Sequence, residues 1–292
     1  MKPTSRSDLK PWKAVALMAL CALPAMAADL HPPANVQAGQ AFSIPVQGSG
    51  GATFYLVGPD NVVKRDVKLG GDLRIEANEV RAAGRYQAIL CDSGCTSASF
   101  EVKAAPPAHL SFFLHPSRVP VSTPNSIDAT AFVFDEYYNL VVAPSTVDFK
   151  ITPARGTAFS LQVSTRRGVA WLRTDSTRNE GRVRVTAVTG GVQEARVVQQ
   201  VATEACGLRV KAVPSGKTVT LETDPVRDCS GNALPDGTVV SFTTVDQDGK
   251  STVDTPIKKG IAKTQVSIRG PAQITVACGV VVGNELSVSG KL

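Results

Sequence analysis

The segment that decides the fold spans residues 228–242 and reads DCSGNALPDGTVVSF. Residues 135–149, which read DEYYNLVVAPSTVDF, follow the same plan. In both segments an Asp precedes an Asn by four residues, and a Phe follows that Asn by ten residues. A register that recurs at domain scale is the signature of tandem modules, so we expect two related domains in this part of the chain.

The chemistry of these residues predicts a loop followed by a strand. An Asp at the start of a turn accepts hydrogen bonds from the backbone amides ahead of it, and Asn tolerates the left-handed conformation. Residues 235–237, Pro-Asp-Gly, tighten the return into the next strand. The Phe that follows, Phe149 or Phe242, is expected to enter the core. Further along, Gly168 and Gly260 each precede another inward-facing strand.

Outward from this repeat, the chain shows strand patterns and no long helical periodicity. Residues 183–188 and 207–213 alternate apolar with polar side chains. The prolines of residues 104–108 mark a stiff, extended linker, because each fixes its own backbone and restrains its predecessor. The predicted fold is all-β, with tandem sandwich domains at 28–105, 106–203 and 204–292 after a signal peptide at 1–27.

Residues 1–27 have the three parts of a secretory signal peptide. Four basic residues precede the apolar run 14–23, and Ala25-Met26-Ala27 supplies the small residues that signal peptidase needs. An uncleaved anchor is the alternative, but the run is shorter than the roughly 20 residues that cross a bilayer. The leader carries four of the 31 basic residues and one of the 25 acidic residues, so cleavage lowers the formal charge from +6 to +3. We therefore expect a periplasmic or secreted protein with no membrane span after cleavage and no nucleic-acid partner.

The five cysteines beyond the leader predict disulfide bonds, because export leads to an oxidising compartment. Cys91 and Cys95 face each other across a short turn, and a bridge there would staple a hairpin. Among Cys206, Cys229 and Cys278 the preferred pair is Cys229–Cys278, and the other two pairings stay open. Because five is odd, at least one thiol stays free or pairs with another chain.

Motifs for catalysis or for cofactors are missing from the sequence. The three histidines, His31, His109 and His115, have no metal-binding spacing. A nucleophile elbow, a phosphate loop and a dinucleotide fingerprint are likewise missing. We therefore expect no catalytic residue, no cofactor and no metal ion, and we expect that the protein is not an enzyme.

The aromatic cluster at residues 132–138 holds the candidate binding residues. Tyr137 and Tyr138 are adjacent in the Asp-to-Asn loop, so they point in different directions and at least one is exposed. Exposed tyrosine suits a binding surface, and the alternative is a tyrosine that covers the end of the sandwich. Phe132 and Phe134 share one face of a strand, and we assign that face to the core.

The phrase at residues 228–242, with Gly260-Ile261-Ala262 downstream, resembles bacterial immunoglobulin-like domains of the invasin and intimin type. The resemblance covers residues 108–292, and residues 135–149 match it more loosely. It implies immunoglobulin-like β-sandwiches of the kind that act as spacers or adhesive modules in envelope proteins. It reports fold more than function.

Three hypotheses about function follow. The first is an exported, non-enzymatic protein that binds a protein or a glycan at the cell envelope through loops at a sandwich pole. The second is a structural spacer, or an assembly subunit of an envelope complex whose strand edges pair with a partner. The third is an enzyme with a site assembled across modules, which would depend on His109 or His115.

Overall fold

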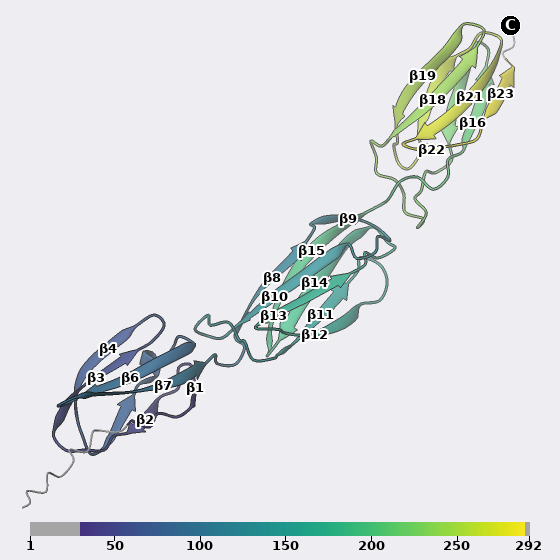
Figure 1. The fold of residues 1–292 in the computed structure, drawn as a ribbon. Coiled ribbons are helices and arrows are strands. Elements are labelled where there is room, and N and C mark those ends of the chain that lie inside the picture. Colours follow the sequence, from purple (N-terminus) through teal and green to yellow (C-terminus); the bar gives the residue numbers. More distant parts are fainter. Residues whose placement is uncertain (1–29, 290–292) are drawn as a thin grey trace, which may run out of the picture.

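The computed structural model describes residues 30–289, and within them three separate hydrophobic cores follow one another along the chain. We name the units built around these cores the first, middle and third domains. Figure 1 shows them arranged end to end, from the purple first domain to the yellow-green third. The predicted leader at residues 1–27 lies outside the described residues.

The first domain packs a five-stranded sheet of order β1-β7-β6-β3-β4 against the pair β2-β5. Alternate side chains of β6, Tyr86, Ala88 and Leu90, are buried. The elements are β1 Asn35–Gln37, β2 Phe42–Pro45, β3 Gly51–Val57, β4 Val62–Lys68, β5 Asp72–Ile75, the 3-10 helix η1 Ala77–Glu79, β6 Gly84–Cys91 and β7 Cys95–Lys103.

The middle domain packs the sheet β13-β10-β8 against the sheet β12-β11-β14-β15-β9. Phe112 and Phe149, one from each sheet, meet in its core with ring centroids 5.9 Å apart. The strands are β8 His109–His115, β9 Arg118–Pro120, β10 Ile127–Phe134, β11 Thr146–Thr152, β12 Phe159–Ser164, β13 Val169–Thr174, β14 Gly181–Thr189 and β15 Val192–Val201.

The third domain repeats this plan. The sheet β16-β17-β20 packs against β19-β18-β21-β22, and β23 also pairs with β21. The strands are β16 Val210–Ser215, β17 Thr218–Thr223, β18 Val239–Asp246, β19 Gly249–Pro256, β20 Lys263–Ser267, β21 Pro271–Cys278, β22 Val281–Val282 and β23 Leu286–Ser289. The all-β sandwich fold predicted from the alternating pattern is thus confirmed.

The two halves of the sequence repeat occupy equivalent positions. Phe149 and Phe242 are both fully buried on the strand that follows the Asp-to-Asn loop. The backbone amide of Val133 donates to the carbonyl of Gly168, and that of Val226 donates to the carbonyl of Gly260. The shared register therefore reflects a shared three-dimensional arrangement.

The assignment of Phe132 and Phe134 to the core is wrong. On β10 the buried positions are Ile127, Ala129, Ala131 and Val133, and the two phenylalanines lie on the outer face, partly exposed. The phenylalanines share their face with Asp128 and Thr130, whereas the other alternating set of this strand is wholly apolar and faces inward. Phe112, beside Ala131 on the neighbouring strand, and Phe149, from the facing sheet, already fill the core next to the small residues of β10.

Candidate functional site

Each of the two Asp-to-Asn loops is built around a buried carboxylate. Oδ1 of Asp135 accepts the backbone amides of Tyr137 and Asn139 at 2.9 and 2.8 Å. Oδ2 of Asp135 accepts the side-chain amide of Asn139 and the backbone amide of Ala105, both at 2.8 Å. Because Ala105 belongs to the connection from the first domain, this one carboxylate ties the loop to the linker.

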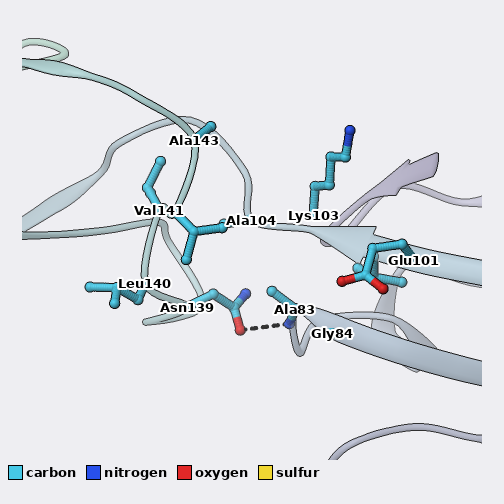
Figure 2. A pocket seen from close by; sticks show the side chains of 11 residues that line it. Ala83, Gly84, Glu101, Lys103, Ala104, Asn139, Leu140, Val141 and Ala143 are labelled. Carbon is cyan, nitrogen blue, oxygen red and sulfur yellow. Dashed lines mark hydrogen bonds between the residues drawn. The ribbon is translucent and has the colours of Figure 1, made fainter. Parts of the chain in front are cut away.

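The Asn of the same loop binds the preceding domain. Nδ2 of Asn139 donates to the carbonyl oxygen of Arg81 at 2.7 Å, and Oδ1 of Asn139 accepts the backbone amide of Ala83 at 2.8 Å. Figure 2 shows this second bond as the dashed line between Asn139 and the segment before β6. A single side chain thus satisfies a donor and an acceptor of the first domain.

The third domain is hydrogen-bonded to the middle domain in the same way. Oδ1 of Asp228 accepts the amides of Ser230 and Asn232 at 2.9 and 2.8 Å, and Oδ2 accepts the amide of Thr203 at 3.1 Å. Asn232 donates to the carbonyl of Arg178 at 2.8 Å and accepts the amide of Glu180 at 3.0 Å. We call each Asp–Asn pair, with its bonds to linker and preceding domain, an interdomain clasp.

Sequence reasoning identified both loops but missed the clasps. The prediction that the Asp accepts amides ahead of it is confirmed. The left-handed residue, however, is Tyr138 with φ 62° in one loop and Gly231 with φ 87° in the other. The Asn side chain instead contacts the preceding domain. The constant spacing between Asp and Asn in the two loops was the sequence feature that singled out this residue.

A cleft opens beside the first clasp. It has a volume of about 580 Å³ and lies between β6 and β7 of the first domain and residues 139–143 of the middle domain. Its wall is largely apolar, and Figure 2 shows Val141 of the middle domain beside Ala104 of the linker. The cleft marks the first joint as a place where the two domains do not pack fully.

The two candidate tyrosines have different surroundings. Tyr137 packs against the core of the first domain, with the Arg81 guanidinium 5.8 Å from its ring centroid. A Cβ added to Gly39 would lie 2.0 Å from the Tyr137 hydroxyl, so this approach requires glycine there. Tyr138 is 71% exposed and stacks on His109 with ring centroids 4.6 Å apart. Tyr137 therefore packs between the first and middle domains, whereas the side chain of Tyr138 is exposed to solvent.

The cysteines pair differently from the preferred prediction. The structure contains the expected Cys91–Cys95 disulfide and pairs Cys206 with Cys229, leaving Cys278 as a buried thiol. The preferred Cys229–Cys278 pair is wrong because the amide of Cys206 binds the carbonyl of Arg227, which sets Cys206 beside the loop. Cys278 instead faces the third core, where burial raises the pKa of its thiol.

The Cys206–Cys229 disulfide ties the linker to the second clasp, and its loss should destabilise the third domain. The bridge spans a sequence separation of 23 residues. From the chain entropy of a loop of this size, we expect the unfolding free energy of the Cys206→Ser/Cys229→Ser variant to be about 3 kcal/mol lower than that of the wild type. Urea unfolding monitored by circular dichroism measures the change. The Cys91–Cys95 bridge spans a sequence separation of only four residues. The matched Cys91→Ser/Cys95→Ser variant should therefore lose less unfolding free energy.

The carboxylate of Asp228 is held ionised by the clasp. Burial is the largest single influence and raises its pKa, but hydrogen bonds from Asn232, Thr203 and Ser230 together outweigh burial. The net pKa of Asp228 is therefore below its usual value. Because the unfolded chain binds this proton at a higher pH than the folded chain, acid favours unfolding.

This shift predicts how the second clasp responds to acid. Its stabilisation is complete above the unfolded pKa, near 3.9 for Asp, and is lost as the pH falls through the lowered folded value. An Asp228→Asn variant imitates the protonated side chain at every pH. The gap in unfolding free energy between wild type and this variant, measured in urea, should shrink from neutral pH to about pH 3. A gap that stays constant over that range would contradict the role of the charge.

A second feature is the outer face of the sheet β13-β10-β8. Phe113 and Trp171 lie on its two outer strands, 60% and 55% exposed, on either side of Thr130. Phe132, on the central strand, packs edge-on against Phe113 with ring centroids 6.0 Å apart. We call Phe113, Phe132 and Trp171 the aromatic face. Monomeric soluble proteins rarely expose large contiguous apolar patches, and such patches often mark a binding surface.

One border of the aromatic face is a charged pair. Nε and Nη2 of Arg173 donate to the two oxygens of Asp128 at 2.7 and 2.9 Å. The Arg173 guanidinium also lies 5.3 Å from the ring centroid of Trp171. The hydrogen bond from Arg173 is the first cause that keeps the pKa of Asp128 below its usual value, so the pair carries no net charge.

The other border reaches the first joint. His109 pairs with Phe134 on the outer face, and the exposed ring of Tyr138 stacks on His109. Tyr138 holds a left-handed backbone where the sister loop has Gly231. A bulky residue in this conformation costs stability, and such strain is a reason to suspect a function.

The third domain lacks this aromatic face, although it has the same sheet. Lys263 follows Gly260 by three residues, as Trp171 follows Gly168. Across the strands, Lys211 and Lys263 both pair with Glu222, as Phe113 and Trp171 both pair with Thr130. Because the sister sheet tolerates charged residues there, the fold does not require the rings.

The fold keeps two of the histidines apart. His109 and His115 lie at opposite ends of β8. Within residues 30–289 no three His, Cys, Asp or Glu side chains come together in a way that could hold a metal ion. Over the same residues, no helix is long and apolar enough to cross a membrane.

The fold defined by these observations is a tandem array of immunoglobulin-like domains of the bacterial invasin type. Solved structures with this arrangement include the Escherichia coli adhesin FdeC, which is 17% identical, with a TM-score of 0.59 over 90% of this chain and 95% of FdeC. InvD of Yersinia pseudotuberculosis is 9% identical, with a TM-score of 0.53 over 91% of this chain and 98% of InvD.

A bacterial invasin described as an integrin-binding protein is also similar, at 13% identity and a TM-score of 0.52 over 90% of this chain. The chain spans 59% of that invasin's length. No protein-family model and no curated protein sequence matches the chain. At these identities the similarity shows the fold alone.

Proposed function

We propose that this chain is an exported, non-enzymatic protein of the bacterial cell envelope that binds a surface protein or glycan through its middle domain. The observation that carries the proposal is the aromatic face, which is exposed in the middle domain and replaced by charged residues in the third. Tryptophan and arginine are the residue types that dominate binding energy at interfaces, and here Trp171 and Arg173 lie side by side.

Two further observations support this function. FdeC is described as an adhesin and the invasin as an integrin-binding protein, and neither description names an enzyme activity. The two disulfides fit an oxidising compartment outside the cytoplasm. We place the binding site on the aromatic face, with Tyr138 at its edge, rather than on the sandwich-pole loops.

An adherence assay tests the proposed function. Beads coated with the full chain are applied to bacterial envelopes and to cultured host cells, and the retained beads are counted after washing. Wild-type beads should be retained several times more than beads coated with Phe113→Lys/Trp171→Lys. The Val280→Lys variant, which changes an 80% exposed valine of the third domain, is the matched control and should behave as wild type. Equal retention of all three would refute the proposal.

The clasps favour a second function, that of a structural spacer. Each domain is attached to the next through a buried carboxylate and an Asn that bonds two backbone groups of its neighbour. Such joints suit a rod of fixed length that holds the middle domain away from a surface. The two functions are compatible, because a stiff rod is a suitable support for a binding face.

A further inference from the structure

We infer that the aromatic face binds an uncharged, linear, β-linked oligosaccharide that lies across the outer sheet. This inference rests on the proposed function and specifies its ligand. The occupant is a glycan chain that stacks on Phe113 and Trp171 and bonds through its hydroxyl groups to the polar side chains between and beside them.

The spacing of the rings supports a sugar chain. Phe113 and Trp171 lie on strands separated by the one central strand β10, so they are about 10 Å apart across the sheet. That separation is close to the length of a disaccharide unit in an extended β-linked chain. The residue between them, Thr130, is small and hydroxylated, so the path from one ring to the other is flat.

The size of the face argues against a large protein partner. Its outward rows run along β8 from His109 to His115 and across three strands, an area of roughly 300 Å². A stable protein interface buries about 800 Å² on each partner. An extended oligosaccharide is narrow enough to use the whole of the smaller surface. A peptide strand would pair with a sheet edge, which does not involve these outward side chains.

The polar groups on the face also suit a neutral ligand with many hydroxyls. Asp128 and Arg173 neutralise each other in a bidentate pair, so the face attracts neither an anion nor a cation strongly. The carboxylate offers acceptors and the guanidinium offers donors beside the ring of Trp171. Thr130 and Ser111, on the same side of the sheet, add hydroxyl groups that donate and accept.

The single reporter needed to test this inference is present in the chain. The sequence holds two tryptophans, and Trp12 lies in the predicted leader. With Trp12→Phe in the full chain, the fluorescence of Trp171 reports on the aromatic face alone. The probes are cellohexaose and chitohexaose, both uncharged and β-linked. Maltohexaose, which is α-linked and coiled, is the control ligand.

The expected result is a saturable change in Trp171 fluorescence with at least one β-linked hexasaccharide and a much smaller response to maltohexaose. Phe113→Lys, which keeps the reporter, should weaken this binding about tenfold or more, and Val280→Lys should leave it unchanged. Lysine occupies the equivalent strand position in the third domain, so the variant should fold; circular dichroism checks this.

Two results of the fluorescence titration would overturn the inference. One is no saturable response to either β-linked probe, and the other is equal affinity in wild type and Phe113→Lys. If bead adherence is lost in Phe113→Lys/Trp171→Lys but neither β-linked probe inhibits it, the partner is a protein. The proposed function then stands while the glycan inference fails. If adherence does not depend on these residues, both fail.

Discussion

Replacing Asp228 with Ala is expected to lower the unfolding free energy of the third domain by about 3 to 5 kcal/mol. The side chain is 3% exposed and accepts hydrogen bonds from the amides of Thr203, Ser230 and Asn232. Alanine leaves all three amides without their acceptor, that of Asn232 buried and the other two partly buried, and it removes the bond that orients the Asn232 side chain. Unsatisfied buried donors cost more than the net value of the bonds they made.

The buried thiol of Cys278 makes this measurement selective for the third domain. In a chain that carries Cys21→Ser, the labelling rate of Cys278 in increasing urea reports when its core opens. The control is Asp236→Ala, which removes an exposed carboxylate bonded to the amide of Lys259. That variant should stay within about 1 kcal/mol of wild type. Similar losses in the two variants would show that the clasp carboxylate has no special role.

Replacing Phe149 with Ala should cost the middle domain a comparable amount, about 3 to 5 kcal/mol. Phe149 is fully buried against Phe112, and alanine leaves a cavity that the two sheets cannot close. Urea unfolding followed by Trp171 fluorescence, in the Trp12→Phe background, measures this domain. Phe159→Ala, on the exposed edge strand β12, is the matched control and should cost much less. A small effect at Phe149 would argue against the core register that the repeat defines.

The parts of the fold that depend on local patterns could be predicted from the sequence. Alternation along residues 183–188 identified β14, and the shared Asp-to-Phe spacing placed Phe149 and Phe242 in equivalent cores. An Asp that accepts the amides two and four residues ahead makes only local contacts, so the loop could also be predicted from the sequence. The likeness to invasin-type domains rested on these local features.

The parts that failed depend on contacts between distant segments. The error at Phe132 is the exception, because this residue shares its face of β10 with Asp128 and Thr130, and that alternation marks the face as exposed. The partner of Cys229 is set by the path of the linker, which brings Cys206 beside the loop. The role of Asn139 depends on backbone groups at Arg81 and Ala83, more than fifty residues away.

The clasps explain why the same loop chemistry occurs twice. Each loop reverses the chain between two strands. Its Asn also bonds the backbone of the preceding domain. The first joint adds Tyr137 against the first domain, and the second adds the Cys206–Cys229 disulfide. The two joints therefore share one clasp and differ in the contact that reinforces it.

Small-angle X-ray scattering of the full chain, compared with Asn139→Ala/Asn232→Ala, tests the central claim most directly. These substitutions remove the Asn side-chain bonds to the preceding domains and leave the two buried carboxylates in place. We expect the wild type to scatter as one extended particle that matches the end-to-end arrangement in Figure 1. The variant should require an ensemble of bent forms with a smaller mean radius of gyration. A wild-type curve that needs the same broad ensemble as the variant would contradict the account of a rod held by interdomain clasps.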